Sequence, residues 1–246
     1  MGCPIDVLDF DETVKRCLEL TDGGGGARQV SMNAAKLAQF GRDSELASFV
    51  RGCDVISADG QAVVWASRVL GEPLPARVPG IDLMQELIAR AEERGLAVYF
   101  LGAREETLER AVERIRSDHP RLRVVGRHHG YFAAEDESRL AEEIRGAAPD
   151  LLFIAMSSPR KEHWLDRNAG LVGVPFAMGV GGALDVIAGE RTRAPAWMQS
   201  VGLEWLHRLL QEPQRMWRRY VFGNLTFVWL VIRELVRRSW GARKHA

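Results

Sequence analysis

The sequence predicts an α/β fold in which helices cover both faces of a mostly parallel sheet. Short apolar runs of four to six residues alternate with longer segments that have a helical pattern, and the alternation continues through most of the chain. Such uniformly apolar strands are typical of parallel sheets that are buried on both sides. The chain has 246 residues, of which 46% are hydrophobic, enough for one α/β body and a small attachment.

The expected elements follow one another in regular order. Strands are expected at residues 29–32, 55–57, 97–101, 123–126, 151–156 and 176–179. Helices are expected at residues 11–20, 34–40, 44–51, 61–70, 81–94, 107–118, 135–146 and 161–167, and the glycines at 23–26 form a connecting turn. Ligands of open parallel sheets bind at the carboxyl ends of the strands, where this sequence has Asp59, Gly102, Ser157 and Gly179.

The net charge of zero conceals a strong asymmetry along the chain. Residues 191–246 hold 11 Lys and Arg against 3 Asp and Glu, a net charge of +8, and the rest of the chain therefore carries −8. Five of the seven tryptophans also lie there: Trp197, Trp205, Trp217, Trp229 and Trp240. An anionic lipid surface fits both features, whereas nucleic acid fits only the charge. We therefore expect a body at residues 1–195 and a basic, membrane-associating appendage at residues 196–246.

The appendage has two helical patterns of its own. Arg208, Arg215 and Arg218 have spacings that place them on one helical face, and Pro213 divides the segment into two helices that would converge on one anion. Farther on, an apolar stripe precedes a basic end; its residues are Leu225, Val228, Trp229, Ile232 and Leu235. The stripe is too short for a transmembrane helix, which needs about 20 apolar residues, so an interfacial amphipathic helix is expected. The alternative is that the stripe packs on the body.

Asp59-Gly60 directly follows the strand expected at residues 55–57. A carboxylate at the end of a parallel strand projects into the cleft and can act as a general base. The alternative is that Asp59 only caps the helix that begins at Gln61, and the local sequence by itself favours the cap.

Other features of the expected cleft suit a diphosphate. Arg77 lies in a loop rich in Pro and Gly, where a guanidinium can hold phosphate oxygens in bidentate fashion, although a lone loop Arg is more often a surface side chain. The cluster Gly179-Val180-Gly181-Gly182 presents unobstructed backbone N–H groups but lacks the G-x-G-x-x-G spacing of dinucleotide enzymes. We find no D-x-D pair positioned to hold the metal of a sugar nucleotide and no His/Cys/Asp cluster with ligand spacing, so no metal is expected. Arginines and backbone amides would then offset the charge of a leaving group.

At this point the motifs and their order resemble a known family. They are Ser31-Met32-Asn33, Ala58-Asp59-Gly60, Arg77-Val78-Pro79-Gly80, Phe100-Leu101-Gly102, Gly130-Tyr131-Phe132, Ser158-Pro159-Arg160-Lys161-Glu162, the glycine cluster with Asp185, Arg193-Ala194-Pro195, Gly202–Leu209 and Glu212–Arg215. This series, which spans nearly the whole chain, resembles the TagA/WecG/CpsF glycosyltransferases. The sequence has Ser31 where the family usually has Thr, and Lys161 where it usually has Gln.

The resemblance implies a Rossmann-like body and an inverting, metal-independent enzyme of cell-surface polysaccharide synthesis that uses no cofactor. Such an enzyme moves N-acetylmannosamine, or a related sugar such as glucose or a uronic acid, from a UDP-sugar to undecaprenyl-diphosphate-linked N-acetylglucosamine. The family's base falls on Asp59, its threonine site on Ser31 and its essential body arginine on Arg77, which favours the base over the cap for Asp59. The implied substrate-binding residues are Asn33, Gly102, Lys161, Glu162, Gly179, Gly181, Gly182, Asp185, Arg208, Arg215 and Arg218.

Two other functional classes stay open on the sequence. One is a non-catalytic protein that binds lipid diphosphates or membranes through the same basic tail, and the other is a nucleotide-dependent enzyme such as an oxidoreductase. The expected partners are a UDP-sugar, a polyprenyl-diphosphate-linked acceptor and an anionic membrane, without nucleic acid, and a homo-oligomer is allowed. Because the N-terminus lacks a secretory-signal pattern and the three cysteines lack metal-ligand spacing, we expect a cytoplasmic protein, peripheral on the inner face of the membrane.

Overall fold

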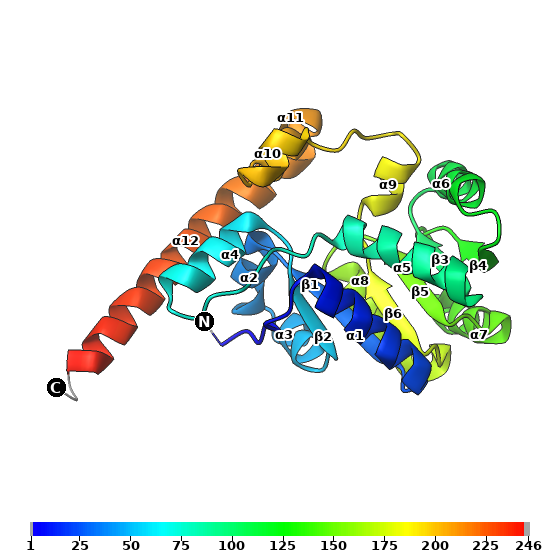
Figure 1. Ribbon diagram of the computed structural model, residues 1–246, viewed down its shortest axis with the longest axis horizontal. Coiled ribbons are helices and arrows are strands. Elements are labelled where there is room, and N and C mark those ends of the chain that lie inside the picture. The colour runs from blue at the N-terminus through cyan, green and yellow to red at the C-terminus, as the bar shows by residue number, and fades with distance from the viewer. Residues whose placement is uncertain (1, 244–246) are drawn as a thin grey trace.

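The structure is a computed structural model that describes residues 2–243, without the side chains of residues 200, 215, 216, 218–221 and 241–243 (Figure 1). Its centre is a single six-stranded sheet. The strands are β1 (Ala27–Met32), β2 (Val55–Ala58), β3 (Ala97–Gly102), β4 (Arg123–His128), β5 (Leu151–Ala155) and β6 (Phe176–Gly179). They lie in the order β2-β1-β6-β5-β3-β4, and every neighbouring pair is parallel. The predicted α/β fold is confirmed, with each expected strand present within two residues of its predicted ends.

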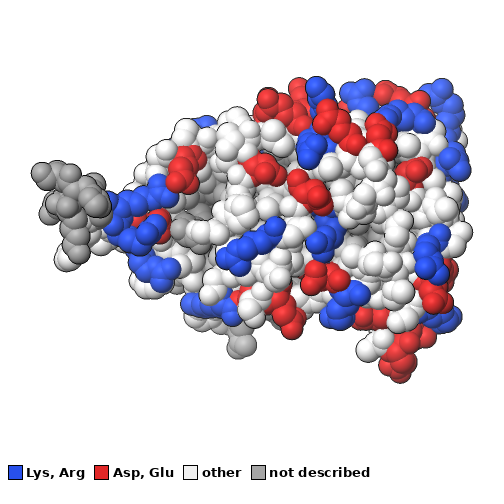
Figure 2. Space-filling view, turned by 90° about the horizontal axis from the view of Figure 1, so that it is seen from below, with Lys and Arg blue, Asp and Glu red and all other residues white. Residues whose placement is uncertain are grey.

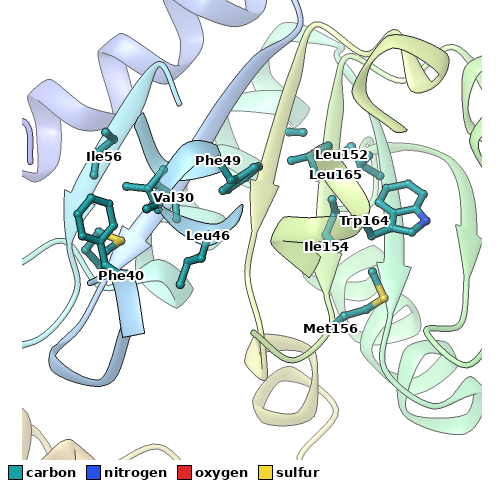
Figure 3. Close-up of a cluster of buried hydrophobic side chains, with 14 of the residues drawn as sticks. Val30, Phe40, Leu46, Phe49, Ile56, Leu152, Ile154, Met156, Trp164 and Leu165 are labelled. Atoms are coloured by element: carbon teal, nitrogen blue, oxygen red, sulfur yellow. The ribbon is translucent and has the colours of Figure 1, made fainter. Parts of the chain in front are cut away.

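Helices cover both faces of the sheet and enclose two apolar cores. One core lies under α2 (Ala34–Phe40), α3 (Ser44–Arg51), α4 (Gln61–Val69), α7 (Glu137–Ala147) and α8 (Arg160–Val172). The other lies under α1 (Phe10–Gly23), α5 (Gly80–Arg94), α6 (Glu105–Asp118) and α9 (Ala183–Ile187). Figure 3 shows the first core, where Phe49 and Leu46 of α3 and Trp164 and Leu165 of α8 lie beside the strands. Burial on both faces explains why β3, β5 and β6 are apolar without alternation, whereas the edge strand β4 is only partly buried and carries Arg and His.

The carboxyl ends of the strands are level along one edge of the sheet. Met32 of β1 pairs with Ala58 of β2, and farther along Ile154 of β5 pairs with Gly179 of β6. The first two strands of the chain join the other four at the β1–β6 pair. Ligands of open α/β sheets bind above the carboxyl ends of the strands at such a junction. We call the region above the carboxyl ends of β1, β2 and β6 the crevice.

Three helices follow the last strand and α9: α10 (Ala196–Ser200), α11 (Glu204–Gln211) and α12 (Pro213–Arg243). The predicted break at Pro213 is confirmed, because α11 ends at Gln211 and proline begins α12, where its missing N–H is harmless. In Figure 1, α12 runs beside α2 and α4 and extends past the sheet.

The two faces of α12 have different environments. On the inner face, Phe227 is buried in the first core, and a Cβ added to Gly223 would lie 3.2 Å from the Ala35 Cβ of α2. Arg238 donates to the Leu70 carbonyl oxygen (2.6 Å) and to Glu72 (2.8 Å). The outer face carries exposed apolar side chains at Phe222, Leu225, Val228, Trp229, Ile232, Val236 and Trp240. Four members of the predicted stripe are thus exposed, so the alternative that it packs on the body is wrong.

No helix among residues 2–243 has the length and apolar composition needed to cross a membrane. Figure 2 shows Lys and Arg side chains at the narrow end of the molecule, where the C-terminal half of α12 lies. In this half Arg233, Arg237 and Arg238 alternate with the exposed apolar residues.

Candidate active site

Asp59 lies at the end of β2, at the edge of the crevice. Its backbone N–H donates to the Met32 carbonyl oxygen of β1 (2.9 Å), which fixes the turn above both strands. The helix that follows, α4, has Gly60 as its N-cap, and among the described residues no side chain caps it. Gly60 has a φ of +127°, a conformation that suits glycine and turns the chain directly after Asp59. The alternative that Asp59 serves only as a helix cap is therefore wrong.

The Asp59 carboxylate lies among charged side chains from α2, from α11 and from the loop before α5. Burial raises the pKa of Asp59, and the negative charge of Glu204 raises it further, whereas the positive charges of Arg208, Lys36 and Arg77 oppose the rise. A carboxylate with a raised pKa is a stronger base than an exposed one. The environment of Asp59 is therefore suited to taking a proton.

Arg77 reaches the crevice from the loop before α5. The Val78 N–H donates to the Ala58 carbonyl oxygen (2.7 Å), which ties this loop to the end of β2. The Arg77 guanidinium is mostly buried and donates to the Glu204 carboxylate of α11 at 3.0 Å. Arg193, which is paired in bidentate fashion with Asp82, lies 4.0 Å from the same Glu204. The Glu204 carboxylate thus lies beside Arg77 and Arg193, at a place where the oxygens of a phosphate group could bind the same two guanidiniums.

Sequence reasoning did not single out Glu204 as a site residue. It stood inside the Gly202–Leu209 motif as an ordinary charge on an amphipathic helix, and only the packing of α11 over the crevice brings it to Arg77. In the sequence, the indication that Glu204 belongs to the site was its position in the Gly202–Leu209 motif.

The glycine cluster after β6 lies against a second group of arginines. A Cβ placed on Gly182 would come within 3.4 Å of Asp185 Oδ2, Arg208 Nη2 and Arg191 Nη1. Arg191 is also 3.4 Å from Asp185 and donates to Glu212 at 2.9 Å. Gly181 has a φ of +56°, and an added Cβ would meet no atom within 4 Å, so this part of the cluster is open. The structure thus brings Gly181, Gly182, Asp185 and Arg208 together, as predicted for residues of one site.

A buried charge cluster lies below the glycine cluster. Glu162 of α8 accepts Lys36 Nζ at 2.8 Å and Lys161 Nζ at 2.9 Å, and all three side chains are less than a tenth exposed. Burial by itself would raise the pKa of Glu162, but the two ammonium groups hold it down to about 2. The Lys161 side chain crosses Gly179 so closely that a Cβ there would lie 2.6 Å from Lys161 Cε. A larger residue at position 179 would therefore displace the Lys161 side chain from this path.

Lys36 was missed at the sequence level because it is a lone charged residue within a mostly apolar helix. It comes from the helix after β1 and Lys161 from the helix after β5, and these two strands flank β6 in the sheet. The positive charge of Lys36 also acts on Asp59, where it opposes the rise of the pKa.

Ser31 and Asn33 lie at the end of β1 with defined hydrogen-bond partners. Ser31 is buried, and its Oγ accepts from Gln29 Nε2 (3.0 Å) and lies 3.4 Å from Ser57 Oγ. Asn33 caps α2, since its Oδ1 accepts from the Lys36 backbone N–H (3.0 Å). Ser31 therefore bonds within β1 and lies against β2, whereas Asn33 holds the β1–α2 turn.

Gly102 lies apart from the Asp59 cluster. Three strands separate it from Asp59 in the sheet order, a separation of about 19 Å at the usual strand spacing. It has a φ of +127°, and an added Cβ would lie 2.5 Å from the Ala155 backbone, so close packing explains the glycine. The predictions for Arg215 and Arg218 concern side chains outside the described residues.

Within residues 2–243, no three His, Cys, Asp or Glu side chains gather as a metal-ligand cluster. The groups that converge on the crevice are instead carboxylates, guanidiniums, ammoniums and backbone amides.

Comparison with known proteins identifies the chain. The model of the glycosyl transferase WecG/TagA/CpsF family matches residues 1–241. An N-acetylglucosaminyldiphosphoundecaprenol N-acetyl-beta-D-mannosaminyltransferase from Bacillus spizizenii is 32% identical over 88% of this chain and 85% of its own length. Proteins with the same name from Bacillus subtilis (31% identical, 72% of this chain, 68% of theirs) and Staphylococcus aureus (37%, 66% and 63%) are also similar. The chain therefore belongs to the WecG/TagA/CpsF family and is a glycosyltransferase.

Proposed function

We propose that the protein transfers N-acetylmannosamine from a UDP-sugar to N-acetylglucosamine linked to undecaprenyl diphosphate, with inversion at the anomeric carbon. The names of its relatives supply the sugar and the acceptor. The observation that carries the proposal is the Asp59 carboxylate, which lies at the strand edge with a raised pKa and has cationic side chains around it.

In the proposed reaction, Asp59 accepts the proton of the acceptor hydroxyl while the hydroxyl oxygen attacks the anomeric carbon. The bond between that carbon and the donor diphosphate breaks, and UDP leaves with the electron pair. Arg77, Arg208 and the amides of Gly181 and Gly182 offset the charge that develops on the diphosphate. A diphosphate oxygen takes the place of the Glu204 carboxylate on Arg77.

The appendage is proposed to complete the site and to dock on the inner face of the cell membrane. Glu204 and Arg208 of α11 reach the crevice, while the outer face of α12 exposes apolar side chains between arginines. This combination is suited to a headgroup interface with anionic lipid. We place the boundary between body and appendage at residues 195–196.

A donor panel tests the proposal. The protein is incubated with a polyprenyl-diphosphate-linked N-acetylglucosamine acceptor and with UDP-N-acetylmannosamine, UDP-glucose or a UDP-uronic acid, and released UDP is measured. We expect the largest acceptor-dependent release with UDP-N-acetylmannosamine. A larger release with another donor would refute the sugar assignment, and no acceptor-dependent release with any donor would refute the proposed reaction.

A further inference from the structure

A groove of about 310 Å³ runs between α2 and α12 and ends at the start of α8. Small side chains of both helices line it at Ala35, Ala38, Gly223 and Thr226, and the longer polar side chains of Gln39 on α2 and of Arg42 just after α2 also line it. The two helices approach closely here, as the 3.2 Å separation between an added Gly223 Cβ and the Ala35 Cβ shows. Small residues on both helices thus leave a space between them that larger side chains would fill.

The two ends of the groove differ in chemistry. At the buried end lie Lys36, held by Glu162, and Ser158, whose Oγ is buried and has no hydrogen-bond partner among the described residues. At the exposed end lies Phe222, which is 61% exposed and begins the apolar outer face of α12. The groove therefore connects the apolar surface of the appendage with the charged edge of the sheet.

We propose that this groove seats the isoprene units next to the diphosphate of the acceptor lipid. This inference rests on the proposed function, because it assigns a place to the lipid part of that acceptor. The chain would enter at Phe222 and pass between the small residues of α2 and α12. Its diphosphate would then emerge beside Lys36 and Ser158, on the side of the crevice where the charge of Lys36 reaches Asp59.

Two acceptors separate lipid seating from the transfer reaction. One carries N-acetylglucosamine on undecaprenyl diphosphate, and the other carries it on an ethyl diphosphate that has no isoprene units. Both are assayed by UDP release in detergent micelles, so that docking on a bilayer does not limit the rate.

Thr226→Phe places an aromatic ring in the groove. We expect the KM for the undecaprenyl acceptor to rise by about tenfold or more, the equivalent of about 1.4 kcal/mol, because the excluded isoprene surface stays exposed. The KM and kcat for the ethyl acceptor should stay within about twofold of the unchanged protein. Ser239→Phe is the matched control, because Ser239 is exposed on the same helix outside the groove. It should leave the KM and kcat for both acceptors unchanged.

A second variant, Phe222→Ser, removes the aromatic ring at the exposed end without adding volume. It should raise the undecaprenyl KM in the same assay and leave the ethyl acceptor unchanged. An unchanged undecaprenyl KM in Thr226→Phe, or an equal rise for both acceptors, would overturn the groove assignment. Failure of the unchanged protein to use either acceptor would instead overturn the proposed function.

Discussion

At the scale of single residues, Asp59 combines a functional role with a cost in stability. Its pKa is raised by burial and by Glu204. A carboxyl whose pKa is higher in the folded than in the unfolded protein stabilises the fold at pH values below its ordinary pKa. That contribution is lost as pH rises through the higher folded value. Ionisation of Asp59 in the folded protein therefore costs stability, as is common for active-site charges.

Asp59→Asn separates these two effects. We expect kcat/KM to fall by about 10²- to 10⁴-fold, the usual contribution of a general base, while the thermal midpoint at pH 7 rises. Steady-state UDP release and calorimetry on the same preparation measure both. A variant that keeps full activity would show that another group accepts the proton.

Glu204→Gln tests the electrostatic coupling between the appendage and Asp59. Because the negative charge of Glu204 raises the pKa of Asp59, its removal should lower that pKa. The acidic limb of the kcat/KM profile should then move to lower pH, since Asp59 stays ionised farther into acid. Glu19→Gln, an exposed position on α1, is the control and should leave the profile in place. A shift to higher pH would contradict the coupling.

In the Lys36–Glu162–Lys161 cluster, we expect the loss of the carboxylate to destabilise the protein more than the loss of one ammonium. Glu162→Gln leaves two buried ammoniums without their carboxylate and should cost about 3–5 kcal/mol, the usual result of breaking a buried pair. Lys161→Gln should cost much less, because Lys36 and Glu162 remain as a balanced pair. Urea unfolding at pH 7 compares the two variants. Equal losses would show that the cluster is not organised around Glu162.

The stability that the same cluster contributes falls as the pH becomes acidic. The pKa of Glu162 is lowered from its ordinary 4.5 to about 2, so the ionised form stabilises the fold. This contribution is fully present above pH 4.5 and is lost as pH falls toward 2.

At the scale of elements, α12 is both a packed helix and an exposed one. Its inner face contributes Phe227 to the core, and Arg238 binds the end of α4. Deleting residues 196–246 would therefore have two effects, because it would remove the appendage and also expose part of α2. Substitutions on the outer face are the sharper test of membrane docking, because they leave these contacts in place.

The double variant Trp229→Gln, Ile232→Gln should weaken binding to vesicles that contain anionic lipid by more than about tenfold. Each side chain is more than half exposed, and its insertion into the interface stabilises binding by about 1.5–3 kcal/mol. Cosedimentation with vesicles measures the loss. Val7→Gln, an equally exposed apolar position on the body, is the control. Unchanged binding in the double variant would refute docking through this face.

At the scale of the whole molecule, the alternating pattern predicted the sheet, because strands buried on both faces are apolar and bounded by turns. Element ends were less predictable: α8 continues to Val172, five residues beyond its predicted end, because packing and not local pattern stabilises its last turns. The sequence also led to Asp59, which directly follows a recognisable strand, and to Arg77, which lies in a recognisable loop.

Contacts made only by folding were not predictable from local patterns. Glu204 and Lys36 look ordinary in the sequence, and their roles arise because α11 closes over the crevice and because β1 and β5 flank β6. Gly102 shows the opposite case: a glycine at a strand end looked like a ligand contact, but the Ala155 backbone explains it.

The most direct test of the account is the mass of the lipid product. The protein is incubated with UDP-N-acetylmannosamine and undecaprenyl-diphosphate-linked N-acetylglucosamine, in parallel with Asp59→Asn. We predict that the acceptor gains the mass of one N-acetylhexosamine with the unchanged protein and that the variant leaves it almost unmodified. An acceptor without added mass, or equal product from both proteins, would contradict the account.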